Sequence, residues 1–406
     1  SGSRDVGARV LYLTQTFPPE PGSTIRPLEQ AQELIAAGHD VTVVTAFANY
    51  PTGRLAPEDR GRLWRRDSID GVDVLRVATI TAPARGRARR IASYLSYAAA
   101  AAVAGGAVRR PDVVIASVPH MFADLGGLAA ARLRGAKLLL ELRDLVPETT
   151  VHAGVDPRSP GYRALARVCR GVRRRVDAIA VPVTSLRDLL VARGECAPED
   201  VLLVPHGVGR ARREAADRTS GRRRLAAGAR PVALYAGSFA RGYGVPDLAR
   251  AARGAPGVLW VLVGAGAERE EVAALAAGAD NVRLLDPCDP RAVGDLIAAS
   301  DLVLSPHATA DSMPYLPVPM TKLTEALALG RPVLARETRS SAGPWLEEHA
   351  AGWGMRWGSA QDVGARVAGI LGDREALAGR TRGARALGVQ FYREHTVRPL
   401  LDWLER

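Results

Sequence analysis

Short runs of β-branched and aliphatic residues alternate with longer Ala- and Leu-rich segments along the chain, and this alternation limits the possible folds more than any other feature. Residues 9–14 have the pattern of a strand, 25–37 that of a helix and 40–45 that of a second strand. A strand, helix, strand order at this spacing is typical of βαβ units, which join parallel strands. We therefore expect an α/β fold built on parallel sheets.

The strand-like runs fall into two groups, each separated by helical segments. The first group continues at 72–77, 112–116, 137–142, 178–183 and 201–204, and the second comprises 232–236, 259–263, 282–284, 302–305 and 332–335. A chain of 406 residues suits two domains of roughly 150 to 200 residues each. We place an N-terminal Rossmann-like domain at 1–206 and a C-terminal one at 207–388. Residues 389–406 have helical periodicity and are expected to pack back on the N-terminal domain.

The chain is basic, with 55 Lys and Arg against 43 Asp and Glu and a formal net charge of +12. Such a balance suits nucleic acid, an anionic membrane or a phosphorylated ligand. Only Lys137 and Lys322 are lysines, and abundant Ala and Gly accompany the arginines, so the excess is also what a high-GC coding sequence produces. Zinc-finger spacing and aromatic RNA-binding motifs are absent from the sequence, which leaves nucleic-acid binding as a minor alternative.

The cysteines and the apolar segments bear on the compartment. Three cysteines without CxxC spacing favour a reducing environment and neither a disulfide framework nor structural zinc. The most apolar stretch, 91–108, is interrupted by two glycines and is too polar for a spanning helix. We expect a cytoplasmic protein. Arginines at 85–90 leave open a peripheral contact of this helix with the inner face of the membrane.

Two loops that follow strands have the composition of anion-binding loops, and ligands of open parallel sheets bind beyond the carboxyl ends of strands. The first contains Gly22 and Ser23 just before a helix, where backbone N–H groups can hold an anion. The second, residues 235–244, places Gly237 and Ser238 beside Arg241. Glycine permits close approach to a phosphate, and the arginine fork can bind it in a bidentate manner. Ordinary capped turns are the alternative for both loops.

A third segment starts a helix at Thr321. Thr321 can cap that helix, and Lys322 lies in its first turn, where a cation opposes the helix dipole. One of two lysines in an arginine-dominated chain occupies this unfavourable place, which favours a phosphate partner. Glu325 lies one turn later on the same face and could accept hydrogen bonds from ribose hydroxyls. An exposed Lys and Glu on a plain surface helix is the alternative.

Several of these segments together resemble the family 4 glycosyltransferases of the GT-B fold. The matching segments are Leu-Thr-Gln-Thr-Phe-Pro-Pro-Glu at 13–20, Gly-His-Asp-Val-Thr-Val-Val-Thr at 38–45, Arg-Asp-Leu-Val-Pro-Glu-Thr at 143–149, the loop with Arg241, and Thr-Lys-Leu at 321–323. The last three are similar to Arg-Asp-Leu-Trp-Pro-Glu-Ser, Gly-Asn-Leu-Gly-Arg-Ala-Gln-Gly and Pro-Ser-Lys-Leu of the bacterial exopolysaccharide and O-antigen branch. The resemblance covers nearly the whole chain.

This resemblance implies two doubly wound domains facing a cleft and a retaining, metal-independent transfer from a UDP- or GDP-sugar, with no cofactor or metal. It implies catalytic roles for Arg241, Lys322 and His120. The implied donor-binding residues are Gly22, Ser23, Gly237, Ser238, Arg241, Thr321, Lys322, Leu323 and Glu325. The implied acceptor-binding residues are Arg143, Asp144 and Glu148, for which a local ion-pair cluster is the alternative.

The chain also departs from the family pattern. Pro317 stands where a first glutamate usually faces the sugar, and Ser238 and Tyr243 replace the usual Arg and Lys of the phosphate loop. A sugar-nucleotide 2-epimerase and a catalytically silent nucleotide-sugar-binding protein therefore remain alternatives. For the acceptor we favour a small molecule of specialised metabolism, such as an antibiotic precursor, attacking through oxygen, nitrogen or sulfur. A lipid-linked saccharide of exopolysaccharide or cell-envelope synthesis is the second choice.

Overall fold

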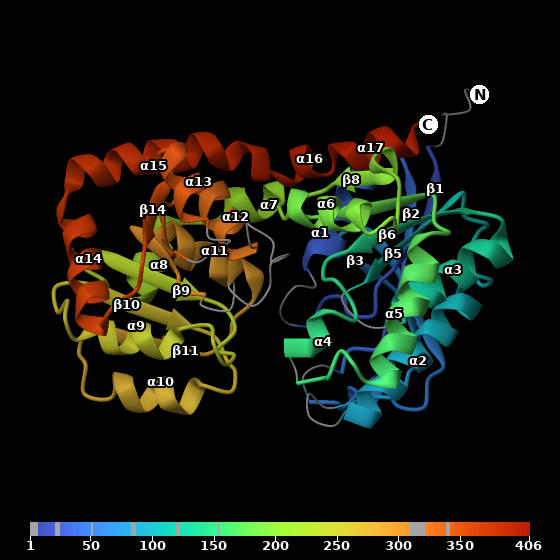
Figure 1. The fold of residues 1–406 in the computed structure, drawn as a ribbon, viewed down its shortest axis with the longest axis horizontal. Coiled ribbons are helices and arrows are strands. Elements are labelled where there is room, and N and C mark those ends of the chain that lie inside the picture. Colours follow the sequence, from blue (N-terminus) through green and yellow to red (C-terminus); the bar gives the residue numbers. More distant parts are fainter. Residues whose placement is uncertain are drawn as a thin grey trace. The chain divides into compact units, whose positions relative to one another are not determined.

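The computed structural model describes residues 7–20, 25–49, 52–82, 87–118, 122–152, 154–307, 321–337 and 342–406. The chain forms two compact units, Ser1–Pro205 together with Val397–Arg406, and His206–Thr396. Each unit consists of one sheet with helices on both faces (Figure 1). The expected α/β class with two mainly parallel, doubly wound sheets is confirmed.

The first unit contains an eight-stranded sheet in the order β3-β4-β2-β1-β5-β6-β7-β8. Its strands are β1 (Arg9–Leu13), β2 (Asp40–Ala46), β3 (Trp64–Ile69), β4 (Val72–Val77), β5 (Val113–Val118), β6 (Lys137–Leu142), β7 (Ala178–Val181) and β8 (Val201–Leu203). Its helices are α1 (Ile25–Ala36), α2 (Arg87–Ala104), α3 (Ala123–Arg134), α4 (Thr149–His152), α5 (Pro160–Arg173), α6 (Thr184–Ala192) and α17 (Arg398–Leu404). All pairings are parallel except that of β3 with β4.

The edge strand β3 was not expected from the sequence. Its residues are all exposed or half-buried, so the strand lacks an apolar signal. It forms a hairpin with β4 through Asp70 and Gly71, which have φ angles of 48° and 84°. Positive φ at both central residues is typical of the tight turns that join antiparallel strands. The hairpin therefore extends the parallel sheet by one antiparallel strand.

The second unit contains a six-stranded sheet, parallel throughout, in the order β11-β10-β9-β12-β13-β14. Its strands are β9 (Val232–Ala236), β10 (Leu259–Val263), β11 (Val282–Leu285), β12 (Leu302–Ser305), β13 (Val333–Arg336) and β14 (Gly352–Met355). Its helices are α7 (Arg210–Ala215), α8 (Arg218–Arg224), α9 (Val245–Ala252), α10 (Arg269–Ala276), α11 (Pro290–Ala299), α12 (Thr321–Ala328), α13 (Gly343–Glu348), α14 (Ala360–Gly372), α15 (Arg374–Gly388) and α16 (Arg393–Thr396).

Both faces of this second sheet are covered. Residues of α11, α12 and α15 pack with one face, and residues of α9, α10 and α14 pack with the other. The central strand β10 is buried along its whole length, as a parallel sheet between two helical layers requires. The strand order reverses between β9 and β12, and in the first unit between β1 and β5. Crevices for ligands form at such reversal points, beyond the carboxyl ends of the strands.

One of two segments near the unit boundaries differs from expectation. Residues 207–230, at the start of the C-terminal domain expected from 207, contain α7 and α8 of the second unit. Residues 389–406 do not form one helix. Val389–Thr396 belongs to the second unit, where Phe391 is buried, and only Val397–Arg406 joins the first. Pro399 lies in the first turn of the separate helix α17, a position where proline favours a new start.

Candidate functional site

The side chain of Lys322 lies directly over Gly237 in the second unit. Lys322 belongs to the first turn of α12, and Gly237 follows β9. A Cβ atom placed on Gly237 would lie 1.9 Å from the Cε atom of Lys322 and 2.4 Å from its Nζ. The φ angle of Gly237 is 158°, a backbone conformation that side chains with a Cβ rarely adopt. Glycine at 237 therefore serves both the backbone conformation and the close approach of the lysine.

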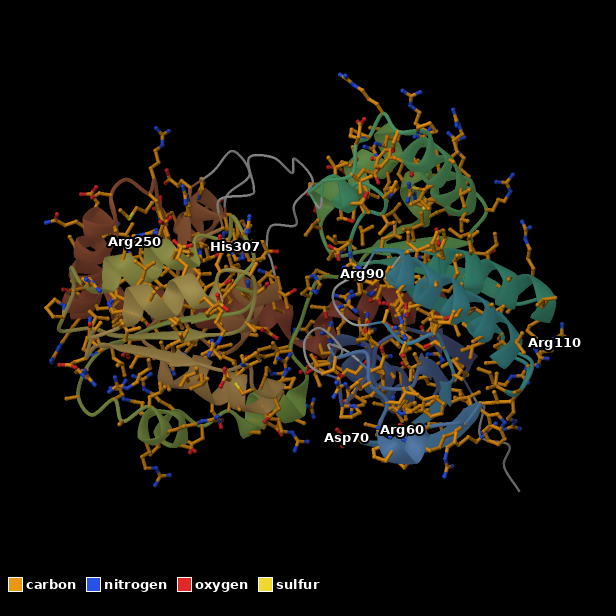
Figure 2. The ribbon with its side chains drawn as sticks, turned by 90° about the horizontal axis from the view of Figure 1, so that it is seen from below. Arg60, Asp70, Arg90, Arg110, Arg250 and His307 are labelled. Atoms are coloured by element: carbon orange, nitrogen blue, oxygen red, sulfur yellow. The ribbon has the colours of Figure 1, made fainter. Side chains whose placement is uncertain are left out.

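Two side chains from neighbouring strand ends accept hydrogen bonds from the Lys322 ammonium. Its Nζ lies 3.1 Å from the hydroxyl oxygen of Tyr235 and 3.1 Å from Nε2 of His307. Tyr235 is in β9. His307, which is labelled in Figure 2, follows β12. The hydroxyl of Tyr235 in turn donates to the carbonyl of Ser238 at 2.7 Å. The strands on the two sides of the reversal point thus meet at one buried cation.

His307 is neutral in this environment. Burial lowers its pKa to about 3, and the charge of Lys322 acts in the same direction. A neutral imidazole has one donor and one acceptor nitrogen. Since Nε2 accepts from Lys322, Nδ1 carries the proton and donates to Ser305 Oγ, 3.3 Å away. The ring centroid of Tyr243 lies 4.8 Å from that of His307 in an edge-on contact.

The Lys322 ammonium has neutral partners. Burial lowers its pKa to about 8, while the charge of Glu325 raises it. Its Nζ lies 4.9 Å from the ring centroid of Tyr235 and 5.1 Å from that of Tyr243, within the range of cation–π attraction. Among the described residues no carboxylate is hydrogen-bonded to this ammonium. A buried cation in such surroundings favours an anionic ligand.

Glu325 is engaged elsewhere in the second unit. One of its carboxylate oxygens accepts a hydrogen bond from Arg212 at 2.6 Å, and both side chains are largely buried. Leu323 is 2% exposed and lies in the core, so its side chain does not face a ligand. Thr321 is exposed and is the first residue of α12. Of the residues expected on this helix, only Lys322 points into the cluster that it forms with Tyr235, Tyr243 and His307, here called the Lys322 cluster.

The loop between β9 and α9 carries Arg241 on a tight turn. Tyr243 N donates to the carbonyl of Ala240 at 3.1 Å, and Arg241 at the turn is exposed. No described residue forms an ion pair with the Arg241 guanidinium. Gly244 ends the loop with a φ of 75°, and a Cβ there would lie 2.6 Å from the carbonyl oxygen of Pro306. Glycine at 244 therefore lets this loop approach the segment that carries His307. Ser238, earlier in the same loop, is exposed.

The three expected acceptor residues lie around the end of β6 in the first unit and differ in environment. Arg143 is buried directly after the strand, and burial lowers its pKa. Asp144 is exposed. Glu148 forms an ion pair with Arg193 at the end of α6.

A buried polar network lies beside Arg143 and was not anticipated. Glu141 accepts a hydrogen bond from Arg26 at 2.8 Å and one from the Tyr12 hydroxyl at 2.7 Å. Although burial opposes ionisation, the positive charges of Arg26 and Arg143 lower the pKa of Glu141 to about 2. Arg26 also donates to the carbonyl of Val204 at 2.9 Å. The sequence contained one signal for this network, a glutamate within the run of leucines in the strand Lys-Leu-Leu-Leu-Glu-Leu.

Three of the expected site residues, Gly22, Ser23 and His120, lie outside the described residues, as does Pro317. Within the described part of the chain, no group of three or more His, Cys, Asp or Glu side chains could hold a metal ion. The helices found there are all too short or too polar to cross a bilayer.

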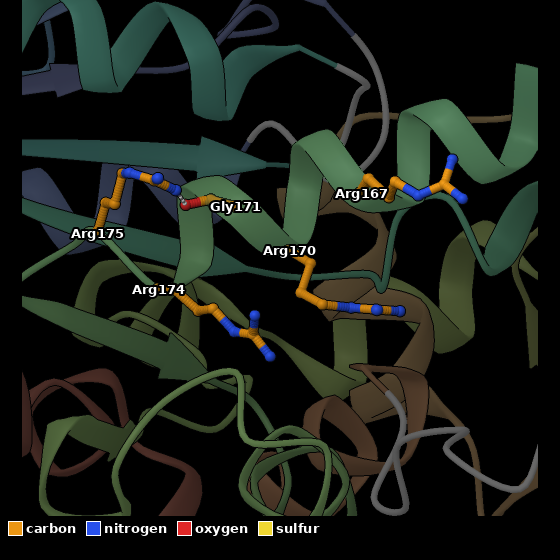
Figure 3. Close-up of a pocket in the computed structure, with 5 residues that line it drawn as sticks. All are labelled: Arg167, Arg170, Gly171, Arg174 and Arg175. Atoms are coloured by element: carbon orange, nitrogen blue, oxygen red, sulfur yellow. Dashed lines mark hydrogen bonds between the residues drawn. The ribbon is translucent and has the colours of Figure 1, made fainter.

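A basic surface lies on α5, away from the residues expected from the sequence. Arg167, Arg170, Gly171, Arg174 and Arg175 line an open pocket of about 500 Å³ (Figure 3). Helix α5 contains no acidic residue, and Val168 on it is 43% exposed. We call this surface the α5 arginine patch. It belongs to the first unit, whereas Lys322 belongs to the second.

Comparisons with known proteins agree with the fold. Residues 22–207 match a glycosyl transferase 4-like domain, and residues 230–373 match the glycosyl transferases group 1 domain. A relative in Escherichia coli K12, WcaI, is described as a colanic acid biosynthesis glycosyl transferase. It is 26% identical over 338 residues, which cover 79% of this chain and 81% of WcaI.

Two solved structures share the fold over almost the whole chain. Sucrose-phosphate synthase from Thermosynechococcus elongatus has a TM-score of 0.73 and 16% identity, with 98% of both chains covered. Anabaena HepE in complex with UDP-glucose has a TM-score of 0.68 and 17% identity, covering 98% of this chain and 99% of HepE. The two domain matches and the relative WcaI show that the chain belongs to the family 4 glycosyltransferases, and the solved structures show the GT-B fold.

Proposed function

We propose that the protein transfers a sugar from a UDP- or GDP-sugar to an acceptor with retention of configuration and without a metal ion. The observation that carries this proposal is the half-buried Lys322 ammonium, which lies between the ends of β9 and β12 and whose hydrogen-bond partners among the described residues are neutral. The diphosphate of a nucleotide sugar supplies the negative charge that this site lacks. The family pattern supports the retaining outcome.

In this reaction the bond between the anomeric carbon and the diphosphate oxygen breaks, and the nucleoside diphosphate leaves. The acceptor's O, N or S atom bonds to the anomeric carbon on the face that the diphosphate left, and its proton passes to the departing phosphate oxygen. Lys322 and the exposed Arg241 stabilise the charge that develops on the leaving group. Backbone N–H groups of Gly22 and Ser23 are assigned to the donor as well, together with Gly237 and Ser238 of the β9–α9 loop, and His120 is assigned to the sugar.

The donor's ribose is assigned to Glu325. Arg212 occupies one carboxylate oxygen of Glu325, and the second can accept from a ribose hydroxyl. Thr321 and Leu323 then contribute through the backbone at the start of α12. Arg143, Asp144 and Glu148 are assigned to the acceptor, which we propose is a small molecule.

The test is nucleotide binding followed by turnover. Thermal shift with UDP, GDP and their sugars is expected to raise the melting temperature selectively for one base, because a ligand of the native state stabilises it. Arg241→Ala and Lys322→Ala are each expected to lower turnover by about 10²–10³-fold with the fold intact. Product without an acceptor would identify a 2-epimerase instead. Binding without turnover on any acceptor would identify a silent binding protein.

The α5 arginine patch favours a second candidate, transfer to a lipid-linked saccharide at an anionic membrane. Arg163, Arg167, Arg170 and Arg174 recur along one side of the helix and are exposed. Basic side chains on an exposed helix bind anionic lipid surfaces. The name of WcaI, which places that protein in colanic acid biosynthesis, supports the same candidate.

Vesicle co-sedimentation tests this candidate. Wild-type protein is expected to sediment with phosphatidylglycerol vesicles and not with phosphatidylcholine vesicles. The triple variant Arg167→Gln, Arg170→Gln and Arg174→Gln is expected to lose this binding. A matched variant that removes three exposed arginines of the second unit, Arg223, Arg224 and Arg366, is expected to keep it. Equal loss in both would indicate a response to net charge alone and would contradict a specific surface on α5.

A further inference from the structure

We propose that His307 is a positioning residue that orients the Lys322 ammonium toward the donor diphosphate without cancelling its charge. The assignment of the diphosphate as the ligand depends on the function proposed above. The orientation of the ammonium by His307 is a property of the free protein and can be measured without any ligand.

The hydrogen-bond count of the ammonium supports this role. A lysine ammonium has three N–H donors. Among the described residues, Tyr235 and His307 accept two of them, each at 3.1 Å. Two fixed acceptors define the direction of the third N–H group. The described side chains thus leave one donor of Lys322 for a ligand.

Both acceptors are held in place by their own contacts. Tyr235 is fully buried, and its hydroxyl proton is used toward the carbonyl of Ser238. His307 is 5% exposed, and Ser305 and Tyr243 contact its ring from two sides. Rigid acceptors reduce the entropy that the lysine side chain loses when a ligand binds.

The chemistry of a neutral imidazole explains why histidine suits this position. A carboxylate at the same distance would neutralise the ammonium and compete with a phosphate for it. A neutral acceptor directs the N–H group and leaves the full positive charge for the ligand. Glu325, the acidic residue on the same helix, is held by Arg212 instead. The cation therefore keeps neutral neighbours in Tyr235, Tyr243 and His307.

The test uses the fact that the chain has only two lysines, Lys137 and Lys322. Protein labelled with ¹³C-lysine gives one signal for each, and the Cε shift reports protonation against pH. His307→Phe retains a ring beside Tyr243 but removes the acceptor, and His307→Gln retains an acceptor. Lys137 lies in the other unit and is an internal control, whose signal is expected to be the same in every variant.

The expected results differ between the two variants. In H307F the pKa of Lys322 is expected to fall by about 1 or more below the wild-type value, because the charged form loses one hydrogen bond. In H307Q it is expected to stay close to the wild-type value. An unchanged titration of Lys322 in H307F would overturn the proposal. So would equal shifts in H307F and H307Q, because a general disturbance of packing would affect both.

Nucleotide binding separates this proposal from the function on which it depends. With the nucleoside diphosphate that binds wild type best, H307F is expected to weaken binding about tenfold in wild-type background and to change nothing in Lys322→Met background. Equal weakening in both backgrounds would overturn positioning through Lys322 while leaving the donor site in place. Absence of nucleotide binding to the wild type would instead contradict the proposed function, and the lysine titration would still decide the role of His307.

Discussion

Replacing Gly237 by alanine should remove Lys322 from its site without unfolding the protein. The added methyl carbon would lie 1.9 Å from Lys322 Cε, whereas two carbon atoms in contact are about 3.5–4.0 Å apart. The lysine end must therefore move by at least about 1.5 Å, which breaks both of its 3.1 Å hydrogen bonds. Lys322 has a flexible end, so the clash is relieved by rotation toward solvent.

The expected loss concerns both ligand binding and stability. A hydrogen bond to a charged group contributes about 1.5–3 kcal/mol, so nucleoside diphosphate affinity should fall roughly 10- to 150-fold. The free energy of unfolding should fall by about 1–3 kcal/mol, because alanine at 237 must adopt a φ of 158° that side chains with a Cβ rarely adopt. Isothermal titration calorimetry measures the first quantity and urea denaturation the second.

The control is Gly369→Ala in α14, where no atom lies within 4 Å of the added Cβ. It should leave affinity unchanged and raise stability by about 0.5–1 kcal/mol, as expected for Gly to Ala inside a helix. In a Lys322→Met background, Gly237→Ala should weaken binding no further. Wild-type affinity in Gly237→Ala, or a further loss in the Lys322→Met background, would refute the reasoning.

Three other measurements test the site and the fold. The charged form of Lys322 binds an anion and its pKa is about 8, so nucleotide affinity should fall as the pH rises through about 8. An affinity that does not change between pH 7 and pH 9.5 would exclude a contact between Lys322 and the nucleotide. Glu141→Gln removes the negative charge that pairs with the buried guanidinium of Arg26 and should cost about 3–5 kcal/mol in urea denaturation at pH 7. The folded pKa of Glu141 is depressed to about 2 from 4.5, so wild-type stability should decline as pH falls from about 4.5 toward 2, and this part of the slope should be absent in Glu141→Gln. Ser359→Ala removes the capping box of α14 and should lower the free energy of unfolding by about 1 kcal/mol. The control Ser238→Ala, in an exposed loop, should leave the free energy of unfolding unchanged.

The sequence predicted the layered fold because buried parallel strands leave a clear mark. Runs such as Leu-Trp-Val-Leu-Val at 259–263 are apolar throughout, as both faces of the strand are covered. The edge strand β3 was missed since most of its residues face solvent. The change of unit between Thr396 and Val397 was also missed, because helical periodicity continues across it.

The site was predicted in part for a related reason. Lys322 and Gly237 were singled out from composition and helix position, which are local properties. The acceptor nitrogen of His307 and the pairing of Glu325 with Arg212 depend on residues 15 and 113 positions away. Contacts of this kind follow from strand order, which the spacing of motifs does not define. His307 directly follows β12, and a search for polar residues after every predicted strand would have included it.

The division of the chain has a consequence for synthesis on the ribosome. The second unit is one continuous stretch, His206–Thr396, whereas the first needs Val397 and Leu400 to fill its core. The nascent first unit therefore waits, with part of its apolar interior uncovered, while about 190 intervening residues are translated. At about 5–20 residues per second this interval is roughly 10 to 40 seconds, during which chaperones have access to the exposed β8 side of the sheet.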